Sequence, residues 1–172
     1  MESNPPKTGK FSLNYGLILG GIGVVFGLML YMADAHTAQS TVNSVVSLVL
    51  SVGVIFWGIL NFRKANGGYL TIGQALKLGA GIALIAGIIS VLYLLLLSNV
   101  LDPDFASKSM DARLAEAAAD NNLTPEQIQQ QKEMGLKFFW VGYPIILIAN
   151  IIIGLIIGLV GGLIFKKAQA DY

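Results

Sequence analysis

The sequence predicts an all-α integral membrane protein with four transmembrane helices and a polar helical hairpin between the third and the fourth. The main observation is a set of four long stretches without Asp, Glu, Lys or Arg, which are Phe11–Ala33, Ala35–Phe62, Leu78–Leu101 and Phe138–Phe165. At about 1.5 Å per residue, a helix of each stretch would cross the roughly 30 Å hydrocarbon core of a bilayer. The composition agrees, since 55% of the residues are apolar and only 12% are charged.

The expected spans cover about residues 13–32, 42–62, 78–98 and 141–165. They use roughly half of the chain, so residues 1–172 are predicted to form a single membrane domain with no room for a separate soluble enzyme domain. The polar tail before the first span, residues 1–10, contains two prolines and is expected to be disordered.

The polar segment 102–137 separates the third and fourth spans and carries seven acidic and four basic residues. A first short helix is expected after Asp102-Pro103, with the aspartate as its cap, and it should stop at Asn121-Asn122. A second helix should begin at Thr124, which can form a capping box with Gln127. The segment is therefore predicted to be a helical hairpin.

The basic residues indicate the orientation of the chain. In a four-span topology, every Lys and Arg outside the hairpin falls on the same side of the membrane. These basic residues are Lys7, Lys10, Arg63, Lys64, Lys77, Lys166 and Lys167. Because basic flanks stay on the cytoplasmic side, both termini are predicted to be cytoplasmic and the hairpin extracytoplasmic. The expected location is the inner (cytoplasmic) membrane of a bacterium, with the lipid bilayer as the main partner.

Small residues recur at helical spacing in three of the four spans. They are Gly16, Gly20, Gly23 and Gly27 in the first, Ala75, Gly79, Ala83 and Gly87 in the third, and Gly154, Gly158 and Gly162 in the fourth. Such stripes let helix backbones approach closely inside a membrane. We expect them to pack the bundle; the alternative is an interface with a membrane-protein partner or a second copy of the chain.

Few strongly polar groups lie inside the spans. The second span carries Ser44, Ser47 and Ser51, whose hydroxyls are expected to bond their own helix backbone. Asn150 is the deepest polar group, and we expect it to bond a neighbouring helix. The alternative is that these four side chains line a path for a solute.

No constellation typical of catalysis or metal binding stands out. The chain has no cysteine and one histidine, His36, which together with Asp34 makes too small a set for a zinc site. Asp102 and Asp104 fit a span exit and a helix cap, so an enzyme using them or His36 on a lipid-linked substrate is the least favoured reading. We expect no cofactor, no metal, no catalytic site and no nucleic-acid partner.

Several short motifs together resemble a known family. They are Asn14-Tyr15-Gly16, the Gly-rich turn leading into Tyr69–Ala75, Tyr93 near the end of the third span, and Asp102–Phe105. In this arrangement the chain resembles the bacterial membrane proteins catalogued as domain of unknown function 4199. The resemblance implies a four-helix inner-membrane protein and an association with envelope glycosyl transfer. It implies no established activity and no site residues.

The function that these observations favour is a non-enzymatic accessory or scaffold protein that binds a membrane partner or a lipid, with the hairpin 102–137 facing the partner. The alternative is a small oligomeric transporter or channel. That alternative is weakened by the absence of a deep carboxylate, histidine or lysine, which coupled carriers usually need.

Overall fold

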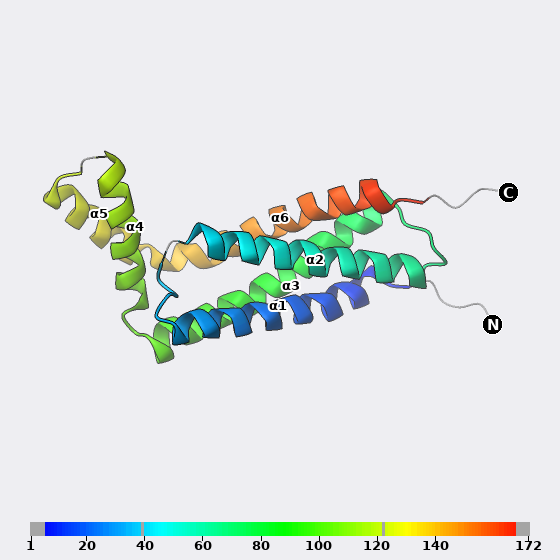
Figure 1. The fold of residues 1–172 in the computed structure, drawn as a ribbon, viewed down its shortest axis with the longest axis horizontal. Coiled ribbons are helices and arrows are strands. Elements are labelled where there is room, and N and C mark those ends of the chain that lie inside the picture. The colour runs from blue at the N-terminus through cyan, green and yellow to red at the C-terminus, as the bar shows by residue number, and fades with distance from the viewer. Residues whose placement is uncertain (1–5, 39, 122, 168–172) are drawn as a thin grey trace.

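The computed structural model describes residues 6–38, 40–121 and 123–167 and shows an all-helical fold (Figure 1). Four segments are long and apolar enough to span a membrane, which confirms the predicted fold class. They are α1 (Thr8–Met32), α2 (Thr41–Ala65), α3 (Ile72–Leu96) with the π-helix η1 (Leu97–Leu101) that extends it, and α6 (Gly142–Phe165) with the 3₁₀ turn η2 (Phe139–Val141) that precedes it.

Two helices begin earlier than predicted. α3 begins at Ile72 rather than near residue 78, because Thr71 and Gln74 form a capping box that starts the helix ahead of the apolar stretch. α1 begins at Thr8, so the end of the tail that was expected to be disordered is helical. Residues 1–5 of that tail lie outside the described residues.

α3 packs against both α1 and α6 through small residues. A Cβ added at Gly79 would overlap the carbonyl of Gly154 and the backbone of Gly158. Gly162 lies against Ala75, so the two helices approach along their backbones over more than two turns. Gly87, one turn beyond Ala83, contacts the side chains of Leu147 and Asn150.

On α1, Gly16, Gly20 and Gly27 lie against Ile85, Ile89 and Tyr93 of α3. Gly23 differs from the expectation that it packs a helix, because a Cβ there would meet open space. At 3.6 residues per turn, Gly23 is turned roughly 60° from Gly20, away from the line of contact with α3.

The two halves of α2 differ sharply in burial. Its second half is packed into the core through Val54, Ile55, Gly58, Ile59 and Phe62. No residue in its first half is buried, and Val45 and Val49 are 53% and 64% exposed. α2 is therefore fixed to the bundle at one end only.

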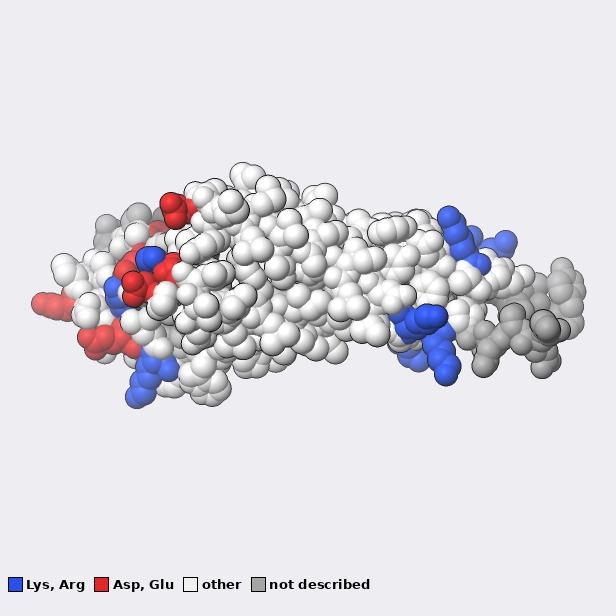
Figure 2. Space-filling view, turned by 90° about the horizontal axis from the view of Figure 1, so that it is seen from below, with Lys and Arg blue, Asp and Glu red and all other residues white. Residues whose placement is uncertain are grey.

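The two ends of the bundle carry different charges. Lys and Arg gather at the end where α1 begins and α6 stops, and at the opposite end acidic residues are mixed with the remaining Lys and Arg (Figure 2). We call them the basic end and the hairpin end. At the basic end, Gly67 and Gly68 have positive φ angles, as the predicted turn requires, and Leu70 forms an antiparallel bridge with Lys167.

The hairpin consists of α4 (Phe105–Asn121) and α5 (Pro125–Lys137), with α4 lying across the end of the bundle (Figure 1). The capping box predicted at Thr124 is present. α4 begins three residues after Asp102 instead of directly at Pro103, because the amide of Asp102 still bonds to Leu97 in the π-helical turn. Lys132 pairs with Asp111 and ties α5 to α4.

Candidate functional site

A buried polar cluster joins the hairpin to the bundle. Nε2 of His36 lies 3.0 Å from Oδ2 of Asp102, and Nζ of Lys108 donates to both carboxylate oxygens at 2.8 and 2.9 Å. The side chains of His36 and Asp102 are only 9% and 8% exposed, whereas that of Lys108 is 53% exposed. The cluster links the loop after α1, the end of the third span and the first turn of α4.

Local backbone geometry brings these three residues together. Asp34 adopts the left-handed conformation with φ of 52°, which Asp tolerates better than most residues and which turns the chain after α1. The π-helical turn at Leu97–Leu101 then places Asp102 beneath this loop. The hydroxyl of Tyr31 donates to the carbonyl of Leu101 at 3.0 Å and holds the two segments in register.

The cluster shifts the acid–base behaviour of its members. The hydrogen bonds from Lys108, and then the one with His36, lower the pKa of Asp102 below its ordinary value. The carboxylate in turn raises the pKa of Lys108. Asp102 is therefore held as an anion at neutral pH, and its negative charge is balanced within the cluster.

A chain of aromatic contacts continues from the cluster into α6. The ring of His36 lies between Tyr31 and Phe105, at centroid distances of 5.1 and 6.0 Å. Phe105 contacts Phe139, which contacts Tyr143, at 6.3 and 6.2 Å. These stacked and edge-on contacts fix the hairpin against the first turn of α6.

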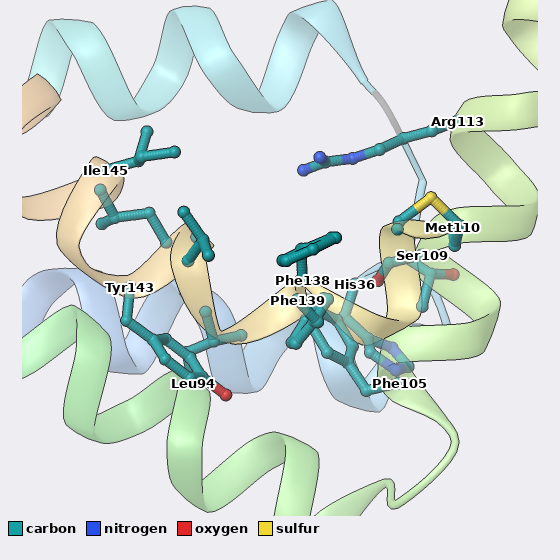
Figure 3. A pocket seen from close by; sticks show the side chains of 15 residues that line it. His36, Leu94, Phe105, Ser109, Met110, Arg113, Phe138, Phe139, Tyr143 and Ile145 are labelled. Carbon is teal, nitrogen blue, oxygen red and sulfur yellow. The ribbon is translucent and has the colours of Figure 1, made fainter. Parts of the chain in front are cut away.

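Beneath the hairpin lies a cavity of about 580 Å³, here called the hairpin cavity (Figure 3). It is lined by residues of α4, α5, η2, the first turns of α6, the loop after α1 and, through Leu94, α3. Most of its wall is apolar or aromatic, formed mainly by Leu94, Phe105, Phe138, Phe139, Ile145 and Ile146. Gly142 also lines it, and a Cβ at Gly142 would meet nothing within 4 Å.

The polar groups of the hairpin cavity are few. Arg113 extends from α4 over the cavity (Figure 3) and is the only one of the described lining residues with a permanent charge. His36 and Ser109 also line it, and within the described part of the chain neither Nδ1 of His36 nor Oγ of Ser109 has a hydrogen-bond partner, although both atoms are buried. The cavity thus combines an apolar wall with one cation and two unpaired polar atoms.

A second hollow runs along the exposed half of α2, and we call it the α1–α2 groove. It consists of two joined spaces of about 340 and 210 Å³ that share Gly23, Phe26 and Ser47. Its polar lining includes Ser44 near the hairpin end, with Ser51, Ser90 and Asn150 deeper in the membrane. The open space at Gly23 belongs to this groove.

The serines of α2 bond their own backbone as expected, with Ser44, Ser47 and Ser51 donating to the carbonyls one turn earlier. Asn150 departs from its prediction. It donates to Ile146 of its own helix at 2.8 Å and not to a neighbouring helix, because the position facing it on α3 is Gly87, which offers no side chain.

In the structure His36 is hydrogen-bonded to Asp102. From the sequence, His36 was considered together with Asp34 as a possible metal site, and Asp102 together with Asp104 as a possible pair of carboxylates. No group of three or more potential metal ligands occurs in residues 6–38, 40–121 and 123–167. Lys108, Ser109 and Arg113 were not singled out from the sequence. For Ser109 and Arg113 the sequence does hold a signal, because they are four residues apart and so lie on one face of α4.

A comparison with protein families matches residues 14–167 to the family described as "Protein of unknown function (DUF4199)". No curated protein matches the chain, and no solved structure matches it either. The family match extends from the first span to the bridge at the basic end and includes the polar cluster and the hairpin cavity. The chain therefore belongs to the DUF4199 family of proteins of unknown function.

Proposed function

We propose that this protein is a non-catalytic accessory protein of a bacterial inner membrane and that it binds a lipid in the hairpin cavity. In this proposal the basic end is cytoplasmic and the hairpin extracytoplasmic, as the distribution of Lys and Arg favours (Figure 2). The observation that carries it is the amphipathic lining of the hairpin cavity at the junction of hairpin and membrane span.

The polarity of the cavity follows the membrane normal. Arg113 and Ser109 belong to the hairpin, outside the four apolar segments, whereas Ile145 and Ile146 lie in the first turns of α6. A lipid has the same order of groups, with a polar head at the surface and chains directed inward. Trp140 and Tyr143 at this level fit the aromatic belt of a membrane interface.

The size of the cavity fits the head and upper chain region of a lipid. Ligand cavities usually measure about 300–1,000 Å³, and this one measures about 580 Å³. The rest of the chains would lie along the lipid-facing surface of α6, where Ile145, Ile148 and Ile152 are 57%, 58% and 51% exposed.

The cluster geometry favours a binding role over catalysis. A histidine that activates a serine must be hydrogen-bonded to it, but His36 Nδ1 and Ser109 Oγ are both without partners among the described residues and so are not bonded to each other. Asp102 is bound by Lys108 as well as by His36, which suits a structural lock.

The test is lipid binding by a variant with a filled cavity. Gly142→Leu adds a side chain into open space within the cavity, and Gly53→Leu adds one into open space on the lipid-facing side of α2. Native mass spectrometry of the delipidated proteins with added phospholipid should show retained lipid for the unmodified protein and Gly53→Leu, and at least about tenfold weaker retention for Gly142→Leu. Equal retention by all three proteins would refute the proposal.

A second candidate is passage of a small uncharged solute along the α1–α2 groove, favoured by the line of Ser47, Ser51, Ser90 and Asn150. Gly23→Leu should block this groove, because Gly23 faces open space within it. Solute flux into proteoliposomes that is unchanged by both Gly23→Leu and Asn150→Leu would rule this candidate out.

A further inference from the structure

We infer that the hairpin cavity selects lipids that carry a phosphate group and that Arg113 is the residue that recognises the phosphate. This inference rests on the proposed lipid-binding function and adds the chemical class of the lipid head. The observation behind it is that the hairpin is acidic overall, yet the charged side chain that lines its cavity is the cation Arg113.

The four basic residues of the hairpin have different environments. Lys108 is bound to Asp102, and Lys132 is bound to Asp111. The ammonium of Lys137 lies 5.8 Å from the centre of the Phe138 ring, in a cation–π contact. Arg113 is the remaining one, and within the described part of the chain no acidic side chain forms an ion pair with it.

Among the residues that the structure describes, no acidic one lines the hairpin cavity, although the segment 102–137 carries seven acidic residues. Two acidic side chains of the hairpin segment, Asp102 and Asp111, are the partners of the two bound lysines. An anion entering the cavity therefore meets the guanidinium of Arg113, which no described acidic side chain neutralises, at the rim of an otherwise mostly apolar wall.

Guanidinium is well suited to this role. Its planar set of donors can bind two oxygens of one phosphate at once, and it is less strongly hydrated than an ammonium group. Arg113 also reaches the cavity from the hairpin side, at the level where the head of a lipid would lie (Figure 3).

The two buried unpaired atoms of the cavity provide further contacts. The hydroxyl of Ser109 can donate to a phosphate oxygen. When Nε2 of His36 donates its proton to Asp102, Nδ1 is left as an acceptor for a hydroxyl group. A phosphate next to a hydroxylated head, as in phosphatidylglycerol, carries the acceptor and the donor that these two atoms lack.

The experiment compares three probes by native mass spectrometry at matched concentrations: phosphatidylglycerol, diacylglycerol with the same chains, and inorganic phosphate. The proteins are the unmodified chain, Arg113→Gln, Arg113→Lys, Gly142→Leu and the control Lys132→Gln. Lys132→Gln removes one positive charge from the same hairpin, but from a side chain already paired with Asp111. Arg113 is exposed, so its replacement should leave the fold intact.

The expected result is a preference for phosphatidylglycerol over diacylglycerol of at least about tenfold, the value of one charge-assisted contact. Arg113→Gln should abolish the preference without weakening diacylglycerol, Arg113→Lys should keep part of it, and Lys132→Gln should keep all of it. Inorganic phosphate should bind weakly, because it lacks the chains that fill the apolar end.

Three outcomes would overturn the inference. They are equal binding of the two lipids by the unmodified protein, a preference that survives Arg113→Gln, and inorganic phosphate binding as tightly as phosphatidylglycerol. The failure of the proposed function itself looks different. In that case Gly142→Leu would bind both lipids as well as the unmodified protein does, whatever Arg113 contributes.

Discussion

The basic end and the hairpin end of the bundle are built in opposite ways. At the basic end, α2 is buried in the core, α3 and α6 touch through their backbones, and the chain closes in a short turn and a bridge. At the hairpin end, α2 is exposed, the hairpin cavity and the α1–α2 groove lie there, and hydrogen bonds between polar side chains join the segments. Rigid packing and ligand-sized space are thus separated along the membrane normal, as expected when a site needs freedom to admit a ligand.

The largest expected effect is at the α3–α6 contact. Gly79→Leu places a side chain where the carbonyl of Gly154 lies, and backbone atoms cannot move aside as a flexible side chain can. We expect a loss of at least about 3 kcal/mol, at the upper end of overpacking costs. Thermal unfolding in detergent measures it, with Gly53→Leu as the control because it adds the same side chain in open space. Equal melting temperatures would show that this contact is not what holds the bundle.

A smaller and more local effect is expected from acid. The folded-state pKa of Asp102 is lowered, so its contribution to stability is complete above its ordinary value and is lost as the pH falls through the lowered one. The pKa of Lys108 is raised, so the contribution of the Lys108–Asp102 ion pair is lost at high pH only in strong alkali, above the ordinary lysine value of about 10.4. Docking of the hairpin through Asp102 should therefore weaken below about pH 4.

Hydrogen exchange, resolved to individual peptides of the protein at a series of pH values, measures this effect. Amides of α4 should lose protection in acid before those of α3 and α6 do. Asp102→Asn should reproduce the loss of α4 protection at neutral pH and remove the acid step. If α4 and α6 lose protection together in the unmodified protein, the cluster is not a local lock.

The smallest effect is expected in the exposed half of α2. Ser47→Ala removes a hydroxyl that bonds only to its own helix, through the carbonyl of Asn43, so the stability should change by about 0.5 kcal/mol or less. A large loss would mean that Ser47 contacts a partner or a second copy of the chain in the membrane. The same thermal unfolding assay, with and without native lipid, separates these cases.

Local signals predicted the elements that depend on neighbouring residues. Thr124 and Gln127 define a helix start by their spacing alone, and Asn66 with two glycines defines a turn. The site was not predictable in this way. His36 and Asp102 are 66 residues apart, and neither has a local signal for the other. That Arg113 has no ion pair with a described acidic residue depends on the partners of the hairpin lysines, and those partners are decided by tertiary structure.

The small-residue stripes were predictable as patterns, but their individual roles were not. Gly20 and Gly23 look equivalent in the sequence, yet one lies against Ile89 and the other lines the groove. Spacing places Gly23 roughly 60° away from the line of contact with α3, but whether another helix fills that side is decided by tertiary packing. Asn150 shows the same limit, because its hydrogen bond depends on the absence of a side chain at Gly87.

The polar cluster also has a consequence for the order of assembly. All three of its members, His36, Asp102 and Lys108, precede the last membrane helix in the chain. Once α4 has left the ribosome, all three residues of the cluster have been synthesised. The partner of Gly79 on α3 is α6, which is synthesised later. The lock at the hairpin end can close in a three-helix intermediate, and α6 then inserts against a platform that is already in place.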